Sequence, residues 1–102
     1  MKHFLLIYTT APGFLERRFE FRDEHLRLAW QAADRGELLL GGALTDPPGM
    51  AALLFAAETS ATAQAFAAAD PYVANGLVEH WEVREWVTVA GTDAAQPFRP
   101  TD

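Results

Sequence analysis

Four runs of hydrophobic residues along the chain have the composition and length of β-strands. Each is bounded by turn signals, and the clearest of these is the stretch Thr-Asp-Pro-Pro-Gly at residues 45–49. The first run is apolar on both faces, which is typical of a central strand. The last run alternates between an apolar and a polar face, with Val78 and Trp86 as apolar exceptions. The predicted strands are residues 3–8, 37–44, 50–58 and 77–89.

The segment between the first two strands has the period of a helix. Residues 14–35 contain neither Gly nor Pro, and Phe21, His25 and Leu28 recur on one stripe. Gly36 follows directly, and glycine favours the left-handed conformation that ends many helices. We therefore expect one unbroken helix over residues 14–35.

A second helix is expected before the last strand. Residues 61–69 are nearly all Ala, which is the strongest helix former, and Ser60 before them is a candidate N-cap. Pro71 disfavours the helical backbone region for the residue before it, so this helix should end at Asp70. A short irregular turn over residues 71–76 then leads into the last strand.

The order strand-helix-strand-strand-helix-strand predicts the fold class. It is the split βαββαβ arrangement of ferredoxin-like α+β folds, in which a four-stranded antiparallel sheet carries both helices on one face. The other face stays open and carries large apolar side chains, so we expect it to pack against the same face of a second copy and form a dimeric α+β barrel. We place this domain at residues 1–89 and a polar, Pro-containing, loosely ordered tail at residues 90–102.

Composition limits the functions that this domain can have. The chain has 102 residues, of which 50% are hydrophobic, so it can bury one compact core. Its net charge is −6, from 8 Lys and Arg against 14 Asp and Glu. This balance disfavours nucleic-acid binding, because phosphates require clustered cations. The absence of Cys excludes disulfides, thiolate nucleophiles and Cys-based metal sites.

The N-terminal sequence indicates the expected location. It has one early Lys and a short apolar run, which is too short for a membrane-spanning helix and lacks the shape of a signal peptide. Because the chain also has no Cys, we expect a cytoplasmic protein without a membrane partner.

His25 is the first candidate for chemistry. It shares a helical stripe with apolar residues, so it points inward or to the edge of the helix. A single inward histidine is most often a hydrogen-bonded core residue. A second chemical group is needed before it indicates a site.

Asp70 is the candidate partner. It follows Phe66 and Ala67 at helical spacing, so it faces the same way as side chains expected to pack on the sheet, where a carboxylate needs a partner. Both helices lie on one face of the predicted sheet, so His25 and Asp70 can meet. The alternative is an Asx-type turn at Asp-Pro-Tyr, and spacing alone favours neither interpretation.

A carboxylate beside an imidazole has a defined role. It holds one ring N–H, fixes the tautomer, and leaves the other nitrogen to act as a general acid or base. Arg18 and Arg22 lie one helical turn apart, and Arg22 precedes His25 by three residues, so they suit a substrate carboxylate or enolate oxygen. The alternative is salt bridging along the helix, which we favour for Arg17 and Arg27.

No metal or cofactor is expected. His3 and His80 lie on predicted strands, but the histidines lack the short spacing of a metal motif. Tyr72 beside the candidate carboxylate either donates a hydrogen bond or packs. Trp30, like the other two tryptophans, is expected in the core or at a dimer interface rather than in a ligand cage.

Three stretches of the chain together resemble a known family. They are ERRFEFRDEHL (16–26), GELLLGGAL (36–44) and AQAFAAADPYVANGLVEHWEVREW (63–86). The YciI-like, or YCII-related, family is similar in its R-x-x-x-R-x-x-H-L helix, its late Gly-containing strand and its D-P-Y turn before a V-E-H-x-x-V strand. The resemblance covers nearly the whole chain, residues 2–89.

The resemblance implies a ferredoxin-like fold, dimers of the α+β barrel superfamily, and an active site in which His25 pairs with Asp70. A related dehydrochlorinase and the similar muconolactone isomerases imply proton transfer on small, ring-derived, negatively charged molecules. The chain departs from the pattern at the turn TDPPGM and in its Ala-rich third strand, which leaves the substrate open. The resemblance further implies these pocket residues: Arg18, Arg22, Gly42 and Tyr72.

Three functions are compatible with these features. The first is an enzyme of the lyase or isomerase type that moves a proton with His25 held by Asp70, for example in dehydrochlorination or lactone isomerisation. The second is a non-catalytic dimer that binds a small anionic metabolite or assists a neighbouring enzyme. The third is a structural dimer without a ligand, in which the histidine and the carboxylate would be open to solvent.

Overall fold

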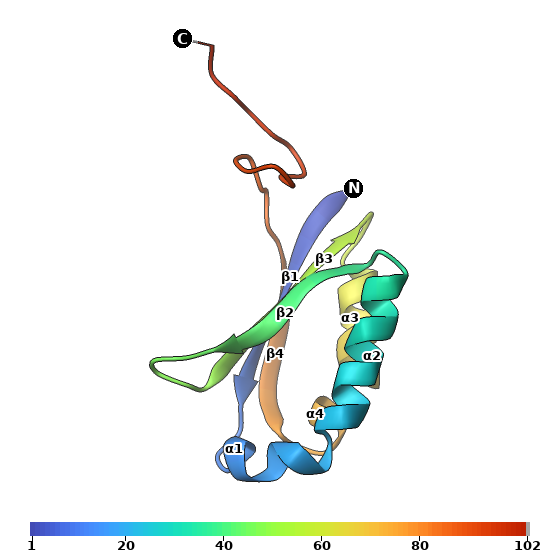
Figure 1. Cartoon of the computed structure of the whole chain (residues 1–102), viewed down its shortest axis with the longest axis vertical. Helices are drawn as coiled ribbons and strands as arrows, with labels where there is room; N and C mark the ends of the chain where they lie inside the picture. Colours follow the sequence, from blue (N-terminus) through green and yellow to red (C-terminus); the bar gives the residue numbers. More distant parts are fainter. Residues whose placement is uncertain (102) are drawn as a thin grey trace.

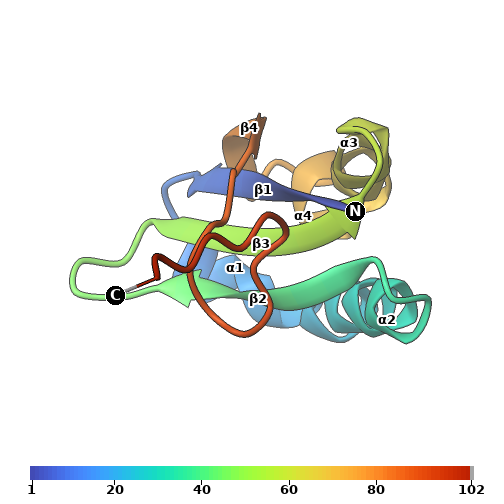
Figure 2. The ribbon, with the colours of Figure 1, turned by 90° about the horizontal axis from the view of Figure 1, so that it is seen from above.

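A computed structural model describes residues 1–101 of the chain. Its four strands form one antiparallel sheet in the order β2-β3-β1-β4, and the helices lie along one face of it (Figure 1, Figure 2). This confirms the predicted α+β, ferredoxin-like class. The elements are β1 (Lys2–Thr10), α1 (Phe14–Arg17), η1 (Arg18–Glu20), α2 (Arg22–Asp34), β2 (Leu38–Leu44), β3 (Met50–Ala57), α3 (Ala61–Ala69), α4 (Pro71–Ala74) and β4 (Val78–Glu85).

The hydrophobic core lies between the sheet and the helices. Phe4, Leu6 and Tyr8 alternate along β1 and are buried, because the helices cover the face of the sheet to which they point. Leu6 pairs with Leu53 of β3 and with Val83 of β4, so the same face continues across the neighbouring strands. The first strand is therefore central, as its apolar character predicted.

The predicted single helix over residues 14–35 is wrong. The chain leaves helical geometry at Phe21, where φ is −121° and ψ is 0°, so a short α1, a 3₁₀ turn and α2 replace it. Contacts with α4 hold the first segment, through the Phe14 ring against Tyr72 and through the Arg17 side chain on the Asn75 carbonyl oxygen. No Gly or Pro marks the break, so local propensity does not explain it. Tertiary packing overrides the local helical preference here.

Of three further local predictions, the helix end at Gly36 is confirmed, whereas those for Ser60 and for residues 71–76 need adjustment. Gly36 ends α2 in a left-handed conformation as expected, with φ of 81°. Ser60 occupies the N-cap position of α3, but its side chain makes no capping bond, and the Thr59 hydroxyl accepts from the Ala61 N–H at 3.2 Å instead. The expected irregular turn over residues 71–76 begins with the helical turn α4.

The last strand is shorter than predicted. β4 ends at Glu85 rather than at residue 89, and Val87 and Val89 are exposed instead of continuing the apolar face. The apolar exception at Val78 is explained by a register shift opposite Thr9 and Thr10, which brings Val78 into the core.

The segment after β4 folds back on itself without forming a helix or strand. The Thr88 hydroxyl lies 2.7 Å from Nδ1 of the buried His3 and also accepts from the Ala95 N–H. The Phe98 N–H donates to the Val89 carbonyl oxygen, and the segment then runs away from the sheet (Figure 1). A domain boundary at residue 89 stays a prediction.

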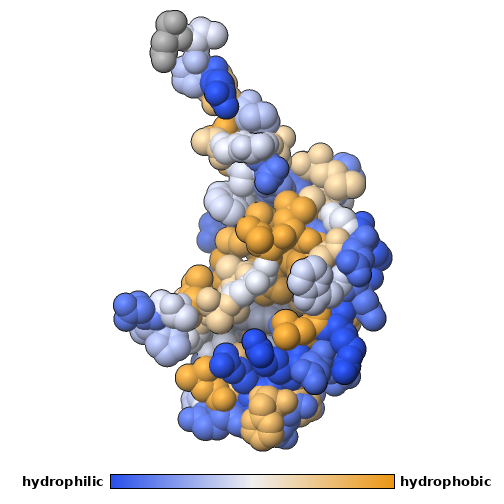
Figure 3. Space-filling model, viewed as in Figure 1, coloured by the Kyte–Doolittle hydropathy of each residue, from blue (hydrophilic) through white to orange (hydrophobic). Residues whose placement is uncertain are grey.

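The face of the sheet opposite the helices has an apolar and a polar part. Register places Trp81 beside Tyr8 on the covered face, which leaves the alternate positions of each strand open. Leu40, Leu44 and Met50 on β2 and β3 are exposed there, whereas β4 contributes polar side chains. Hydrophobic surface gathers over the β2 edge of the molecule in Figure 3.

Candidate functional site

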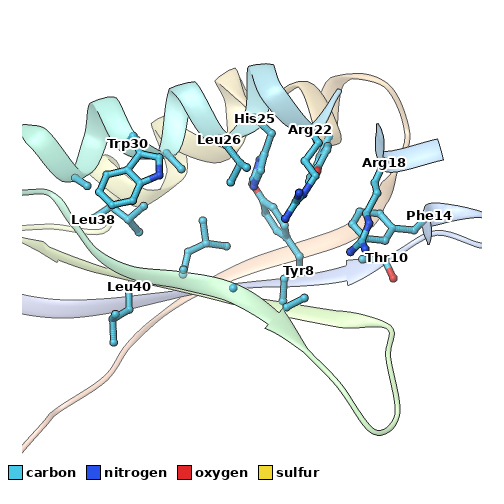
Figure 4. A pocket seen from close by; sticks show the side chains of 18 of the residues that line it. Tyr8, Thr10, Phe14, Arg18, Arg22, His25, Leu26, Trp30, Leu38 and Leu40 are labelled. Carbon is cyan, nitrogen blue, oxygen red and sulfur yellow. The ribbon is translucent and has the colours of Figure 1, made fainter. Parts of the chain in front are cut away.

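A cavity of about 380 Å³ lies between α2 and the β2 side of the sheet. Side chains from β1, α1, η1, α2, β2, β3 and α4 line it, and Figure 4 shows α2 above and β2 below. Its volume falls at the lower end of the range of roughly 300–1,000 Å³ that ligand pockets occupy. The cavity therefore suits a small organic molecule.

Asp70 lies directly behind the cavity, where three hydrogen-bond donors from cavity-lining residues converge on its carboxylate. Its side chain is fully buried, and Oδ2 accepts from the Tyr8 hydroxyl at 2.7 Å. Nδ1 of His25 lies 2.9 Å from Oδ1 and 3.0 Å from Oδ2, and the Tyr72 backbone N–H donates to Oδ1 at 3.0 Å. A buried carboxylate is tolerated because both oxygens have donors.

The local sequence explains why a carboxylate sits at this point. Asp70 is the C-cap of α3 and also the N-cap of α4, with Pro71 at the first helical position of α4. Its charge therefore meets the favourable N-terminal end of α4, rather than only the unfavourable C-terminal end of α3. The alternatives of a turn and a chemical partner for Asp70 are both realised, since one carboxylate serves as the cap and contacts His25.

His25 is fixed by stacking as well as by hydrogen bonding. Its ring lies over the Tyr72 ring with centroids 4.0 Å apart and planes 11° from parallel, and Phe66 approaches edge-on at 6.4 Å. The His25 side chain is 14% exposed whereas that of Asp70 is at 0%. Since Nδ1 is engaged by the carboxylate, the ring that points into the cavity in Figure 4 offers Nε2 to a ligand.

Tyr8 is a site residue that the sequence analysis missed. Burial raises the pKa of the Tyr8 hydroxyl far above its usual range, and the negative charge of Asp70 and the hydrogen bond to it act in the same direction. Tyr8 therefore remains a neutral donor to the carboxylate. A signal was present, since Tyr8 shares the buried face of β1 with Phe4 and Leu6, where a phenol needs a partner.

Tyr72, Arg18 and Arg22 all border the cavity, as the resemblance implied. Burial raises the pKa of the Tyr72 hydroxyl, although the positive charges of Arg22 and Arg18 oppose this shift. Neither arginine forms a salt bridge within residues 1–101. The salt bridges favoured for Arg17 and Arg27 are likewise not found in this part of the chain, where Arg17 bonds a backbone carbonyl instead.

Gly42 and Trp30 also line the cavity. A Cβ added at Gly42 would meet nothing within 4 Å, whereas at Gly41 it would meet Leu53 at 3.4 Å, so Gly41 has the closer packing. Trp30 was expected in the core or at an interface, but its side chain borders the cavity and is 68% exposed in the single chain.

The three histidines lie in separate environments. His25 faces the cavity, His3 is buried beside Thr88, and His80 is exposed on β4. Within the described residues, no three His, Asp or Glu side chains converge closely enough to hold a metal ion. No helix over this range is long and apolar enough to cross a membrane.

The matched sequence extends over most of the domain. The model of the YCII-related domain matches residues 1–87. The chain belongs to this family. Protein YciI of Escherichia coli O6:H1 and protein YciI of Shigella flexneri are each 36% identical over 84 residues, an alignment that covers 74% of this chain and 86% of each relative. These matches confirm the family that the sequence stretches indicated.

Two solved structures are similar in fold to this member of the family. One is the 5-chloro-2-hydroxyhydroquinone dehydrochlorinase TftG of Burkholderia phenoliruptrix AC1100 in complex with 2,5-dihydroxybenzoquinone, with a TM-score of 0.71, 21% identity, and coverage of 84% of this chain and 94% of that chain. The other is protein Atu4242 of Agrobacterium tumefaciens, with a TM-score of 0.58, 15% identity, and coverage of 93% and 98%. Both likenesses support the ferredoxin-like α+β fold.

Proposed function

We propose that this protein is a proton-transfer enzyme of the lyase or isomerase type that acts on small, anionic, ring-derived molecules. The observation that carries the proposal is the contact of His25 with the fully buried Asp70 beside a cavity of ligand size. A buried carboxylate that accepts from Nδ1 leaves Nε2 as the proton-exchanging atom. The 14% exposure of His25 argues against a structural pair that is open to solvent.

The proposed reaction begins at a carbon next to a carbonyl group. Nε2 of His25 takes a proton from this carbon, and the electron pair of the broken C–H bond forms an enolate. Loss of chloride from the adjacent carbon completes a dehydrochlorination, whereas return of the proton to a different carbon completes an isomerisation. Arg22 and Arg18 border the same cavity and would stabilise the enolate oxygen or a substrate carboxylate.

Asp70 and Tyr8 act as positioning residues in this proposal. Asp70 accepts from Nδ1 and so holds the imidazole in one tautomer and one orientation. Tyr8 donates to Oδ2 of Asp70 and keeps the carboxylate in place without competing for the proton, since its own pKa is raised. The activity of the similar TftG, a dehydrochlorinase in complex with a benzoquinone, supports this reaction class.

The assembly that we propose is a homodimer through the open face of the sheet. Leu40, Leu44 and Met50 expose apolar surface there, and burying it in a second copy would remove it from water. Light scattering across a dilution series should give the mass of a dimer, and Leu40→Glu should give a monomer. Leu15→Glu, at an exposed leucine of α1, should leave the dimer intact. A wild-type monomer at every concentration contradicts this assembly.

The activity is tested with chlorinated hydroquinones and unsaturated lactone carboxylates in D₂O. Chloride release reports elimination, and deuterium incorporation reports proton exchange at carbon. We expect turnover by the wild type and a rate loss of about a hundredfold or more in His25→Gln. His80→Gln is the matched control, because His80 is exposed on β4 outside the cavity.

Two results would decide against catalysis. If the wild type turns over no member of the panel, the enzymatic proposal fails. If panel compounds raise the melting temperature of wild type and His25→Gln equally and no product forms, the protein is the non-catalytic binding or accessory module instead.

A further inference from the structure

One stripe of α2 lines the cavity and changes character along its length. Arg22, Leu26 and Trp30 follow one another at intervals of four residues, and all three border the cavity. Figure 4 shows them in this order, with Arg18 beyond Arg22 at one end and Leu38 near Trp30 at the other. The cavity therefore has a cationic end and an apolar end, with His25 between them.

The cationic end consists of the guanidinium groups of Arg18 and Arg22. Within residues 1–101, neither Arg18 nor Arg22 has a carboxylate at salt-bridge distance, although the surrounding helical segment is rich in Asp and Glu. Guanidinium groups that border one cavity in this way match the oxygens of a carboxylate or an enolate.

The apolar end has a large aromatic side chain at its surface. Trp30 is 68% exposed and Leu26 is 36% exposed, while Leu38 is buried beside them and lines the same cavity. An exposed indole leaves apolar surface in contact with water, and a ligand in the adjoining pocket could cover this surface. A flat or branched apolar group of a ligand would stack on it and remove its surface from water.

The position of His25 along α2 locates the reacting atom of such a ligand. His25 is three residues from Arg22 and five from Trp30, which corresponds to about 4.5 Å and about 7.5 Å along the helix axis. His25 is therefore placed on α2 nearer to Arg22 than to Trp30. The carbon that exchanges its proton should be next to the acid group rather than within the apolar part.

We propose that the cavity selects amphipathic organic acids. The acid group binds at Arg18 and Arg22, the apolar end packs on Trp30, and the carbon beside the acid group faces His25. Trp30 and Leu26 are then residues that determine specificity. The inference rests on the proposed function only in taking His25 as the group that exchanges the proton, and its binding preferences can be measured without any reaction.

The test compares three probe molecules on the full chain. They are 3-phenylpropionate, propionate, which lacks the ring, and 3-phenylpropanamide, which lacks the charge. Binding is followed in every variant by NMR through the backbone amide signals of residues that line the cavity, and in proteins that keep Trp30 also through its indole N–H signal, assigned with Trp30→Phe. We expect 3-phenylpropionate to bind about tenfold more tightly than either of the other two and to shift the Trp30 signal.

Substitutions at the two ends should remove one preference each. Arg22→Gln should abolish the preference for the acid over the amide, and Trp30→Ala should abolish the preference for 3-phenylpropionate over propionate. Arg27→Gln and Phe98→Ala are matched controls, because both side chains are exposed and neither lines the cavity. Each control should keep both affinity ratios.

Specific results overturn the inference. Equal affinity for the three probes does so, and so does a Trp30 signal that follows protein concentration, as at a subunit interface, instead of added acid. If both affinity ratios hold but the activity panel shows no turnover, the binding inference stands and the proposed enzymatic function fails. If turnover occurs without these ratios, the inference on specificity fails alone.

Discussion

The inner wall of the cavity and its mouth differ in burial and in hydrogen bonding. The inner wall consists of Tyr8 and Tyr72, which line the cavity, and of Asp70 directly behind them. All three are buried, and Asp70 accepts hydrogen bonds from both tyrosines, of which Tyr8 is 62 positions away along the chain. The mouth consists mainly of Arg22, Leu26 and Trp30 on one helix, and all three are exposed. Arg22 forms no salt bridge within residues 1–101. The wall fixes the histidine, whereas the mouth is left for a ligand to satisfy.

The wall and the mouth should therefore tolerate amino-acid substitutions to different degrees. A substitution in the wall leaves buried donors without acceptors and should affect the whole fold. A substitution at the mouth changes only surface contacts, so ligand choice can vary while the proton-transferring pair stays constant. The following substitutions test this division.

The largest effect is expected for Asp70→Ala. It removes the acceptor of the Tyr8 hydroxyl, of His25 Nδ1 and of the Tyr72 N–H at once. Leaving such groups unsatisfied should lower the free energy of unfolding by about 3–5 kcal/mol, measured by urea denaturation. Asp34→Ala, at the exposed end of α2, is the control and should stay within about 0.5 kcal/mol of the wild type. A comparable loss in the free energy of unfolding in both variants would show that the inner wall is no more important for stability than an exposed helix end.

A smaller effect is expected for Tyr8→Phe at neutral pH. The ring still packs in the core, but the 2.7 Å hydrogen bond to Asp70 is lost. We expect a loss of about 1–2 kcal/mol in the free energy of unfolding, because the carboxylate keeps its other donors. An unchanged free energy of unfolding would mean that Tyr8 does not support the carboxylate.

The same variant should change the response to alkaline pH. The pKa of Tyr8 is raised in the folded state, so its contribution is fully present below the ordinary tyrosine pKa of about 10 and declines above it. The advantage of the wild type over Tyr8→Phe should fall by about 1.4 kcal/mol per pH unit in that range. Parallel stability curves above pH 10 would contradict the raised pKa.

The smallest effect on stability is expected for Arg22→Gln. Arg22 is exposed and forms no salt bridge within the described chain, so its removal should change the free energy of unfolding by less than about 0.5 kcal/mol. A loss of ligand affinity without a loss of stability would confirm that the mouth serves binding. A clear destabilisation would assign Arg22 to the wall.

Much of the fold could be predicted from hydrophobic periodicity. The order of strands and helices along the chain follows from hydrophobic periodicity, and the C-terminal ends of α2 and α3 follow from Gly36 and Pro71, which act within a few residues. The break at Phe21 could not be predicted, because packing against α4 causes it and no local breaker marks it. The early end of β4 also depends on tertiary structure rather than on local sequence, because β1, its neighbour in the sheet, begins at Lys2.

The candidate site was predictable only in part. His25 and Asp70 could be paired, because helical spacing turns both toward the sheet. Tyr8 was missed, since its bond to Asp70 depends on the depth of β1 in the sheet. Trp30 lies outside the core and borders the cavity, and its place at a dimer interface stays a prediction. An aromatic residue beside a core stripe has the same sequence pattern whether it lines a cavity or an interface.

The central claim is that Asp70 holds Nδ1 of His25 and leaves Nε2 for proton exchange. Nitrogen NMR of protein labelled at histidine tests it most directly, at a pH where the imidazole is neutral, with the His25 signals assigned from His25→Gln. We predict a single tautomer with the proton on Nδ1 and an unprotonated Nε2. A proton on Nε2, or the averaging of both tautomers seen for an exposed histidine such as His80, would contradict it.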